Sequence, residues 1–130
     1  MLTQYLYIST APKLSRDEVN SILESSARNN PAHSITGLLL YNGRNFLQLL
    51  EGEGADLDAL MERISHDPRH TGVSVLHSSP IDERACPGWA MKRVFIAESI
   101  ENRKEVLERD LPQGLDPQVR KMILNFAVLN

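Results

Sequence analysis

Residues 35–52 read ITGLLLYNGRNFLQLLEG, and this stretch decides the fold. Two apolar, strand-like runs, residues 35–41 and 45–50, lie on either side of Asn42-Gly43. This pair readily adopts the positive φ angles of a tight hairpin turn, and with Arg44 included the connection can carry a bulge. The stretch therefore predicts a β-hairpin.

The segment before the hairpin predicts a strand followed by a helix. Residues 2–9 mix Leu, Ile and Tyr and end at a turn that contains Pro12. Ser15 and Glu18 predict a capping box, in which the Ser15 hydroxyl accepts from the Glu18 backbone N–H and the Glu18 carboxylate reaches back to the Ser15 N–H. Pro31 ends the helix, because a residue before proline avoids the α region. The apolar stripe of this helix consists of Val19, Ile22, Leu23 and Ala27.

The segment after the hairpin predicts a second helix and two more strands. Residues 56–65 carry an apolar helical stripe, and residues 73–78 and 89–96 have the composition of strands. The order is therefore β-α-β-β-α-β with one added strand. This order predicts an α+β, ferredoxin-like βαββαββ domain, a mixed five-stranded sheet with two helices on one face.

The C-terminal segment differs in character from the rest of the chain. Residues 101–108 and 117–128 predict two short amphipathic helices. The apolar stripe of the second helix consists of Val119, Met122, Ile123 and Phe126. This stripe is either a contact surface for another protein or a face that folds back over the sheet. We expect residues 1–97 to form the domain and residues 98–130 a C-terminal helical extension.

The composition argues against several classes of function. The chain has 130 residues, a net charge of -3, 42% hydrophobic and 24% charged residues, which is typical of one soluble domain. It contains no Lys/Arg block that could follow a nucleic-acid backbone, so we expect no direct nucleic-acid binding. Its apolar runs are far shorter than the roughly 20 residues of a membrane helix, and a signal-peptide pattern is absent. We therefore expect a cytoplasmic protein that does not enter a membrane.

The sequence contains neither a metal-binding nor a catalytic motif. His66 and His70 are four residues apart, but Pro68 between them breaks the helix that such a pair of ligands requires. The phosphate-binding glycine motifs and G-x-S-x-G are absent. Cys86, the single cysteine, has no obvious basic or histidine partner in the sequence, which favours an inert thiol. We expect no metal and no enzymatic activity.

Polar residues within apolar segments mark the candidate site. A buried polar group without a partner costs about 1–3 kcal/mol, so Gln48, which shares a strand face with Phe46, needs an explanation. It is either an edge-strand or solvent-facing glutamine, or an amide presented to a buried polar partner. Tyr7 is either a core residue with its hydroxyl near water or part of the same site. Asn29 and Asn30 are either a helix cap or binding residues.

Together these segments resemble the BLUF family of blue-light sensors in order and spacing, over roughly residues 2–95. The resemblance implies a ferredoxin-like domain that binds FAD non-covalently between its two helices, with FMN or riboflavin as smaller substitutes. It also implies a photoreceptor that signals without being an enzyme. The matching segments are YIS at 7–9, NN at 29–30, ITGLLLY at 35–41, FLQLLEG at 46–52, DPRH at 67–70 and WAM at 89–91.

The resemblance assigns roles to individual residues. Gln48 matches the glutamine that faces flavin N5 and O4, and Tyr7 matches the tyrosine that hydrogen-bonds it and donates an electron. Ile22 and Ile64, with Phe46 nearby, match the apolar residues that sandwich the ring. Asn30 matches the asparagine that binds the pyrimidine edge, and Asn29 occupies the neighbouring position, which varies within the family but which we include among the candidate binding residues. The positions that match the polar set around the pyrimidine edge, the ribityl chain and the phosphate are Arg63, Asp67, Arg69 and His70.

Trp89 and Met91 match the pair that passes the signal from the glutamine to the surface, and we include Ser9 in this relay. Strand alternation predicts that Trp89 and Met91 project to the same face of the fifth strand. Family members often have an aromatic residue three positions before the tryptophan, where this chain has Cys86 followed by Pro87. Whether Trp89 points towards the flavin or towards solvent is therefore left open.

The mechanism implied by the resemblance begins with blue-light excitation of the flavin. Tyr7 transfers an electron and then a proton through Gln48, whose amide is left rotated or tautomerised. A new hydrogen bond to flavin O4 gives a small red shift, which relaxes in the dark because no bond to the protein forms. The expected output passes through the fifth strand to the tail helices. The expected partners are a second copy of the chain (a homodimer or higher homo-oligomer) and a separate downstream protein.

Two alternative functions fit the residues less well. One is a light-insensitive flavin-binding interaction module, against which the intact Tyr7 and Gln48 argue. The other is a small acylphosphatase-like hydrolase that uses an Arg and an Asn, against which the missing phosphate-cradling loop argues.

Overall fold

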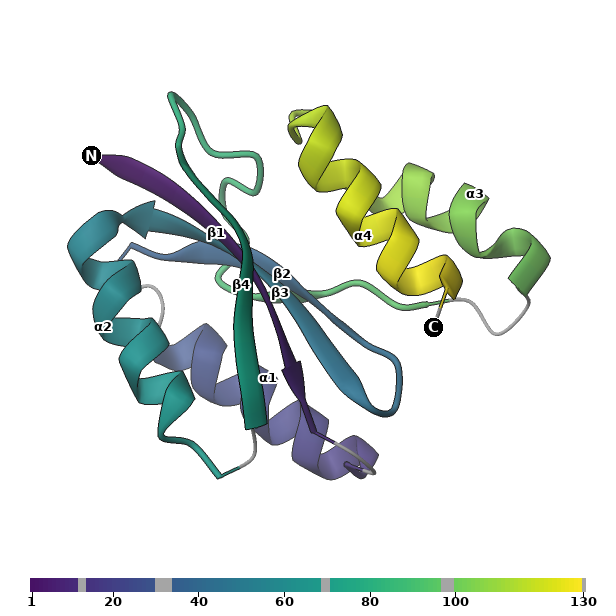
Figure 1. The fold of residues 1–130 in the computed structure, drawn as a ribbon, viewed down its shortest axis with the longest axis horizontal. Coiled ribbons are helices and arrows are strands. Elements are labelled where there is room, and N and C mark those ends of the chain that lie inside the picture. The colour runs from purple at the N-terminus through teal and green to yellow at the C-terminus, as the bar shows by residue number, and fades with distance from the viewer. Residues whose placement is uncertain (12–13, 30–33, 69–70, 97–99, 130) are drawn as a thin grey trace.

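The computed structural model describes residues 1–11, 14–29, 34–68, 71–96 and 100–129, and its elements follow the predicted order (Figure 1). The strands are β1 (Leu2–Thr10), β2 (Thr36–Tyr41), β3 (Asn45–Glu53), β4 (Thr71–Pro80) and β5 (Lys92–Arg93). The helices are α1 (Arg16–Asn29), α2 (Gly54–Ser65), α3 (Ile100–Asp110) and α4 (Pro117–Leu129). None of the helices in the described ranges has both the length and the apolar composition needed to cross a bilayer.

The strands form one sheet in the order β4-β1-β3-β2-β5. Strand β1 pairs antiparallel with both β3 and β4, and β2 pairs antiparallel with β3. The β2–β5 pair is parallel, which makes the sheet mixed. The units β1-α1-β2 and β3-α2-β4 each leave room for one strand between their own two. This split arrangement confirms the predicted ferredoxin-like class.

The predicted hairpin and capping box are both present, but of the pair Asn42-Gly43 only Gly43 adopts a positive φ. Gly43 has a φ of 91° in the hairpin turn, and Asn42 Oδ1 accepts from the backbone N–H of Asn45 at 2.7 Å. At the start of α1, the Glu18 backbone N–H donates to Ser15 Oγ at 3.1 Å. The Ser15 N–H in turn donates to the Glu18 carboxylate at 3.1 Å, which completes the capping box.

The sheet has a buried core on each of its two faces. Helices α1 and α2 cover one face, and α3 and α4 lie on the other (Figure 1). Because side chains alternate along a strand, successive residues of β1, β2 and β3 point to opposite faces of the sheet. Those on the α1/α2 face are Tyr7, Leu39, Phe46 and Leu50. Those on the α3/α4 face are Leu6, Leu38, Leu40, Leu47 and Leu49.

The apolar stripe of α4 is covered by the sheet. Val119, Ile123 and Phe126 are buried in the same core as Leu38 and Leu49. Of the two alternatives left open by the sequence, an open contact surface is therefore wrong, and the tail folds back over the sheet. The reason is physical, because the leucines on this sheet face would otherwise be exposed to water.

The fifth strand is much shorter than the predicted range 89–96. Gly88 has a φ of 80°, and Pro87 before it has no backbone N–H to donate, so the chain turns here instead of extending. It joins the sheet over the two residues of β5, which pair with Leu38 and Leu39.

Gly37 in β2 has no room for a side chain. A Cβ atom at this position would lie 1.9 Å from the backbone oxygen of Leu49 on the neighbouring strand. We predict that Gly37→Ala lowers the free energy of unfolding by more than about 2 kcal/mol in a chemical denaturation experiment. Gly54→Ala is the matched control, because its nearest contact is the Thr3 hydroxyl at 3.5 Å. Equal stability of the two variants would contradict the prediction.

Candidate functional site

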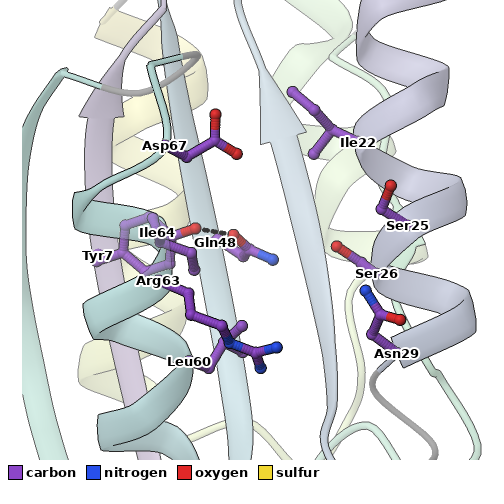
Figure 2. Close-up of a pocket in the computed structure, with 10 residues that line it drawn as sticks. All are labelled: Tyr7, Ile22, Ser25, Ser26, Asn29, Gln48, Leu60, Arg63, Ile64 and Asp67. Carbon is purple, nitrogen blue, oxygen red and sulfur yellow. Dashed lines mark hydrogen bonds between the residues drawn. The ribbon is translucent and has the colours of Figure 1, made fainter.

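A cavity of about 180 Å³ lies between α1 and α2, above the central strands (Figure 2). A single water occupies roughly 30 Å³ of liquid, so the cavity can receive part of an organic molecule. Helix α1 supplies Ile22, Ser25, Ser26 and Asn29; α2 supplies Leu60, Arg63 and Ile64; Asp67 follows α2; and Tyr7 and Gln48 come from the sheet.

Tyr7 and Gln48 form a hydrogen-bonded pair at the sheet side of the cavity. They are direct cross-strand partners on β1 and β3, and both are buried. The Tyr7 hydroxyl donates to Gln48 Oε1, and Gln48 Nε2 donates to Met91 Sδ at 3.3 Å. Because β3 is a central strand and Gln48 is buried, the alternative of an edge-strand or solvent-facing Gln48 is wrong. Reversing the amide would exchange a donor and an acceptor at this position.

The environment of Tyr7 keeps its phenol protonated. Burial, and then the negative charge of Asp67, raise the pKa of Tyr7 well above its usual value of 10.0. The hydroxyl is thus a hydrogen-bond donor to Gln48 at every pH at which the protein is ordinarily handled. A proton is therefore always available at this atom.

The two helices give the cavity apolar walls. Figure 2 shows Ile22 on α1 and Ile64 on α2 at opposite sides of the space. A flat aromatic ring needs two such walls and a few polar groups at its edge. Phe46 is buried on the same sheet face, but it packs against the Tyr41 ring, with centroids 4.6 Å apart, and does not line the cavity.

The polar candidates divide into two groups. Asn29, Arg63 and Asp67 line the cavity, and Figure 2 shows Arg63 and Asp67 reaching from the α2 side into the space between the helices. Three of the predicted residues, Asn30, Arg69 and His70, lie outside the described residues. Ser9 is buried on β1, two residues after Tyr7.

Trp89 and Met91 lie on opposite sides of the sheet, so the prediction that they share one face is wrong. Met91 is buried in the core of the α1/α2 face and contacts Gln48. Trp89 packs, half-buried, against the core beneath α3 and α4, with Lys92 Nζ 4.4 Å from the centre of its ring. It faces the tail helices. The two residues precede β5, so strand alternation does not apply to them.

Sequence reasoning missed three residues that line the cavity. Ser25, Ser26 and Leu60 belong to it but carry no motif of their own. Helical spacing would have found them, because Ser25 and Ser26 follow Ile22 by three and four positions and Leu60 precedes Ile64 by four. In the part of the chain that the structure describes, no three His, Cys, Asp or Glu side chains gather to hold a metal ion.

Comparison with known proteins gives one consistent result. Residues 2–92 match the family model of BLUF, "sensors of blue-light using FAD". Photoactivated adenylate cyclase subunit beta of Euglena longa is 42% identical over 92 residues, which are 69% of this chain and 11% of the cyclase. The chain therefore spans about a tenth of the length of that relative.

Two solved structures resemble the whole chain. The dark-state structure of BlrB, a BLUF protein, has a TM-score of 0.75 and 31% identity over 96% of both chains. Klebsiella pneumoniae BlrP1, in a calcium/cy-diGMP complex, has a TM-score of 0.83 and 28% identity, over 98% of this chain and 34% of BlrP1. The likeness thus includes the tail helices as well as the sheet.

The raised pKa of Tyr7 predicts a loss of stability at alkaline pH. Below about pH 10 the phenol is protonated in both the folded and the unfolded chain. Above it the unfolded chain loses this proton and the folded chain keeps it. The free energy of unfolding should therefore fall by an additional 1.4 kcal/mol or so per pH unit in the wild type relative to Tyr7→Phe. Denaturation series between pH 9 and 11.5 measure both slopes, and parallel slopes would contradict the prediction.

Proposed function

The chain belongs to the BLUF family of blue-light sensors that use FAD, and we propose that light acts on it through the hydrogen bond between Tyr7 and Gln48. The observation that carries this proposal is the position of the pair. Two buried polar side chains from the two central strands meet beside a cavity with apolar walls. An amide there can change its orientation without moving the backbone.

The residues around the cavity fit a flavin. Ile22, Leu60 and Ile64 provide apolar surfaces from both helices, as a planar ring requires. Asn29, Arg63 and Asp67 would meet the polar edge and chain of FAD, and FMN would use the same ring contacts. Asn30, Arg69 and His70 complete the proposed contact set. When bound, the flavin supplies the absorption of blue light and an acceptor for one electron.

The part played by the protein begins at the Tyr7 hydroxyl. Tyr7 gives up an electron, and its proton moves along the existing hydrogen bond to Gln48 Oε1. When the electron and proton return to Tyr7, the Gln48 amide is left reversed or tautomerised, with donor and acceptor exchanged. Because no covalent bond has formed to the protein, thermal motion restores the dark arrangement.

The reversed amide changes the contacts of Met91. In the structure Gln48 Nε2 donates to Met91 Sδ, a contact that a reversed amide cannot make. Two residues before Met91, Trp89 lies on the other face of the sheet, against the core of the tail helices. We propose that this crossing carries the signal from the cavity to α3 and α4, with Ser9 as a further part of the relay.

We propose that the two parts of the chain have different roles. Residues 1–97 form the flavin-binding unit, and residues 98–130 form the extension that receives the signal. The output is a change in contacts with a second copy of the chain or with a separate downstream protein. In this proposal the chain acts as a sensor and not as an enzyme, because the family that it matches is described as sensors of blue light. The family match favours neither the acylphosphatase-like hydrolase nor the light-insensitive module.

Tyr7→Phe tests the electron-donor role. We predict that this variant binds flavin, and that the small red shift of the flavin band after blue light disappears. Tyr5→Phe is the matched control, because Tyr5 lies two positions earlier on β1 and hydrogen-bonds Asp58 outside the cavity. It should retain the full shift. Absorption spectra before and after illumination measure both, and a shift that survives in Tyr7→Phe would contradict the assignment.

A further inference from the structure

Glu51 is a buried carboxylate on the sheet face opposite the cavity. It lies on β3 three residues after Gln48, and its side chain has no exposed surface. Its Oε1 accepts from the Cys86 backbone N–H at 2.9 Å and from the Thr36 hydroxyl at 3.1 Å. Its Oε2 accepts from the Ala85 N–H at 2.7 Å and from a side-chain amide, Gln4 Nε2, at 3.2 Å. All four groups are donors, so the site is matched to an acceptor-only side chain.

Arg84 extends this network to the hairpin. One of its nitrogens, Nη1, donates to the Thr36 hydroxyl at 2.8 Å and to the backbone oxygen of Glu51 at 2.9 Å. The other, Nη2, donates to the Ser34 oxygen at 2.6 Å. A buried carboxylate needs hydrogen bonds to offset its desolvation, and Arg84 holds one of its four donors, the Thr36 hydroxyl, in place. We call the set of Glu51 and its hydrogen-bonded neighbours the Glu51 network; its members are Gln4, Thr36, Glu51, Arg84, Ala85 and Cys86.

The Glu51 network holds the segment that leads to Met91. Residues 81–91, between β4 and β5, contain neither helix nor strand. Glu51 fixes this segment at Ala85 and Cys86, and the Gly37 N–H donates to the Trp89 oxygen at 2.9 Å. Met91 follows Cys86 by five positions, and there its sulfur meets Gln48 on the cavity face.

We propose that Glu51 and Arg84 are positioning residues for the light switch: they hold the 81–91 segment so that Met91 Sδ meets the Gln48 amide, and thereby set the lifetime of the light-induced state. This inference rests on the proposed function, because it concerns the same amide. The connection is mechanical. Glu51 and Gln48 project from one strand to opposite faces, and the anchored segment crosses the sheet edge between Trp89 and Met91. Loosening the anchor on one face therefore moves the contact on the other.

Glu51→Gln is the direct test, since it keeps the shape and replaces one acceptor oxygen by an NH₂ group that faces two donors. We expect flavin binding and the red shift to persist. The rate of dark recovery should change at least threefold or so, the size of effect that one lost hydrogen bond gives. Glu53→Gln is the matched control, because Glu53 is on the same strand and 59% exposed, and its rate should be unchanged.

A double-mutant cycle separates positioning from general stability. If Glu51 acts through Met91, its substitution has no further effect on recovery in a Met91→Ala background. Additive effects of the two substitutions, or an unchanged rate in Glu51→Gln, would overturn the proposal. Should Glu51→Gln not fold, Arg84→Lys carries the same test, because lysine cannot reproduce the two-nitrogen fork that joins Thr36 to Ser34.

Trp89 provides a readout that does not depend on light. It is the single tryptophan of the chain and lies on the anchored segment, so its emission reports the environment of that segment. We expect the Trp89 emission maximum to shift to longer wavelength in Glu51→Gln relative to the wild type, and to stay unchanged in Glu53→Gln. A wild-type protein without a light-induced shift would contradict the proposed function. The Trp89 emission would then still decide whether Glu51 holds the segment, and unaltered emission would overturn that part.

Discussion

The pairing of Tyr7 with Gln48 across the two central strands is the interaction on which the rest of the structure depends. Both polar groups are buried, so each needs a partner, and the β1–β3 register places them opposite one another. A one-residue shift in that register would place the two side chains on opposite faces of the sheet. The pair also has a cavity beside it, because α1 and α2 stand apart over the same strands. One register thus determines both the hydrogen bond and its access to a ligand.

The two faces of the sheet differ in composition and in what covers them. The α1/α2 face combines apolar walls with a few polar side chains, as binding sites for flat ligands do. The α3/α4 face is an apolar core in which the tail covers leucines of the sheet, and Glu51 lies buried in the same layer. Contacts that cross between the faces run along the irregular segment before β5, where Trp89 and Met91 lie on opposite sides. In our proposal, this segment is the path by which a change at the cavity reaches the core beneath the tail.

Local patterns predicted most of the fold, and long-range contacts account for what they missed. The hairpin turn at Gly43 and the capping box at Ser15 depend on neighbouring residues, which a sequence displays directly. The length of β5 depends on how Pro87 and Gly88 turn the chain towards β2. The burial of the α4 stripe depends on which face of the sheet α1 and α2 leave uncovered. For the site, Gln48 could be found as a polar residue in an apolar strand. Glu51 could not, because its partners at 84–86 lie more than thirty positions away.

The central claim is that light changes the orientation or tautomer of the Gln48 amide. A light-minus-dark infrared difference spectrum of the flavin-loaded protein tests it most directly, compared between unlabelled protein and protein with isotope-labelled glutamine side chains. The account predicts difference bands that shift with the label, because the amide has different hydrogen-bond partners in the two states. A difference spectrum that is unaffected by the label would contradict the account, since the amide would then be a spectator of the light reaction.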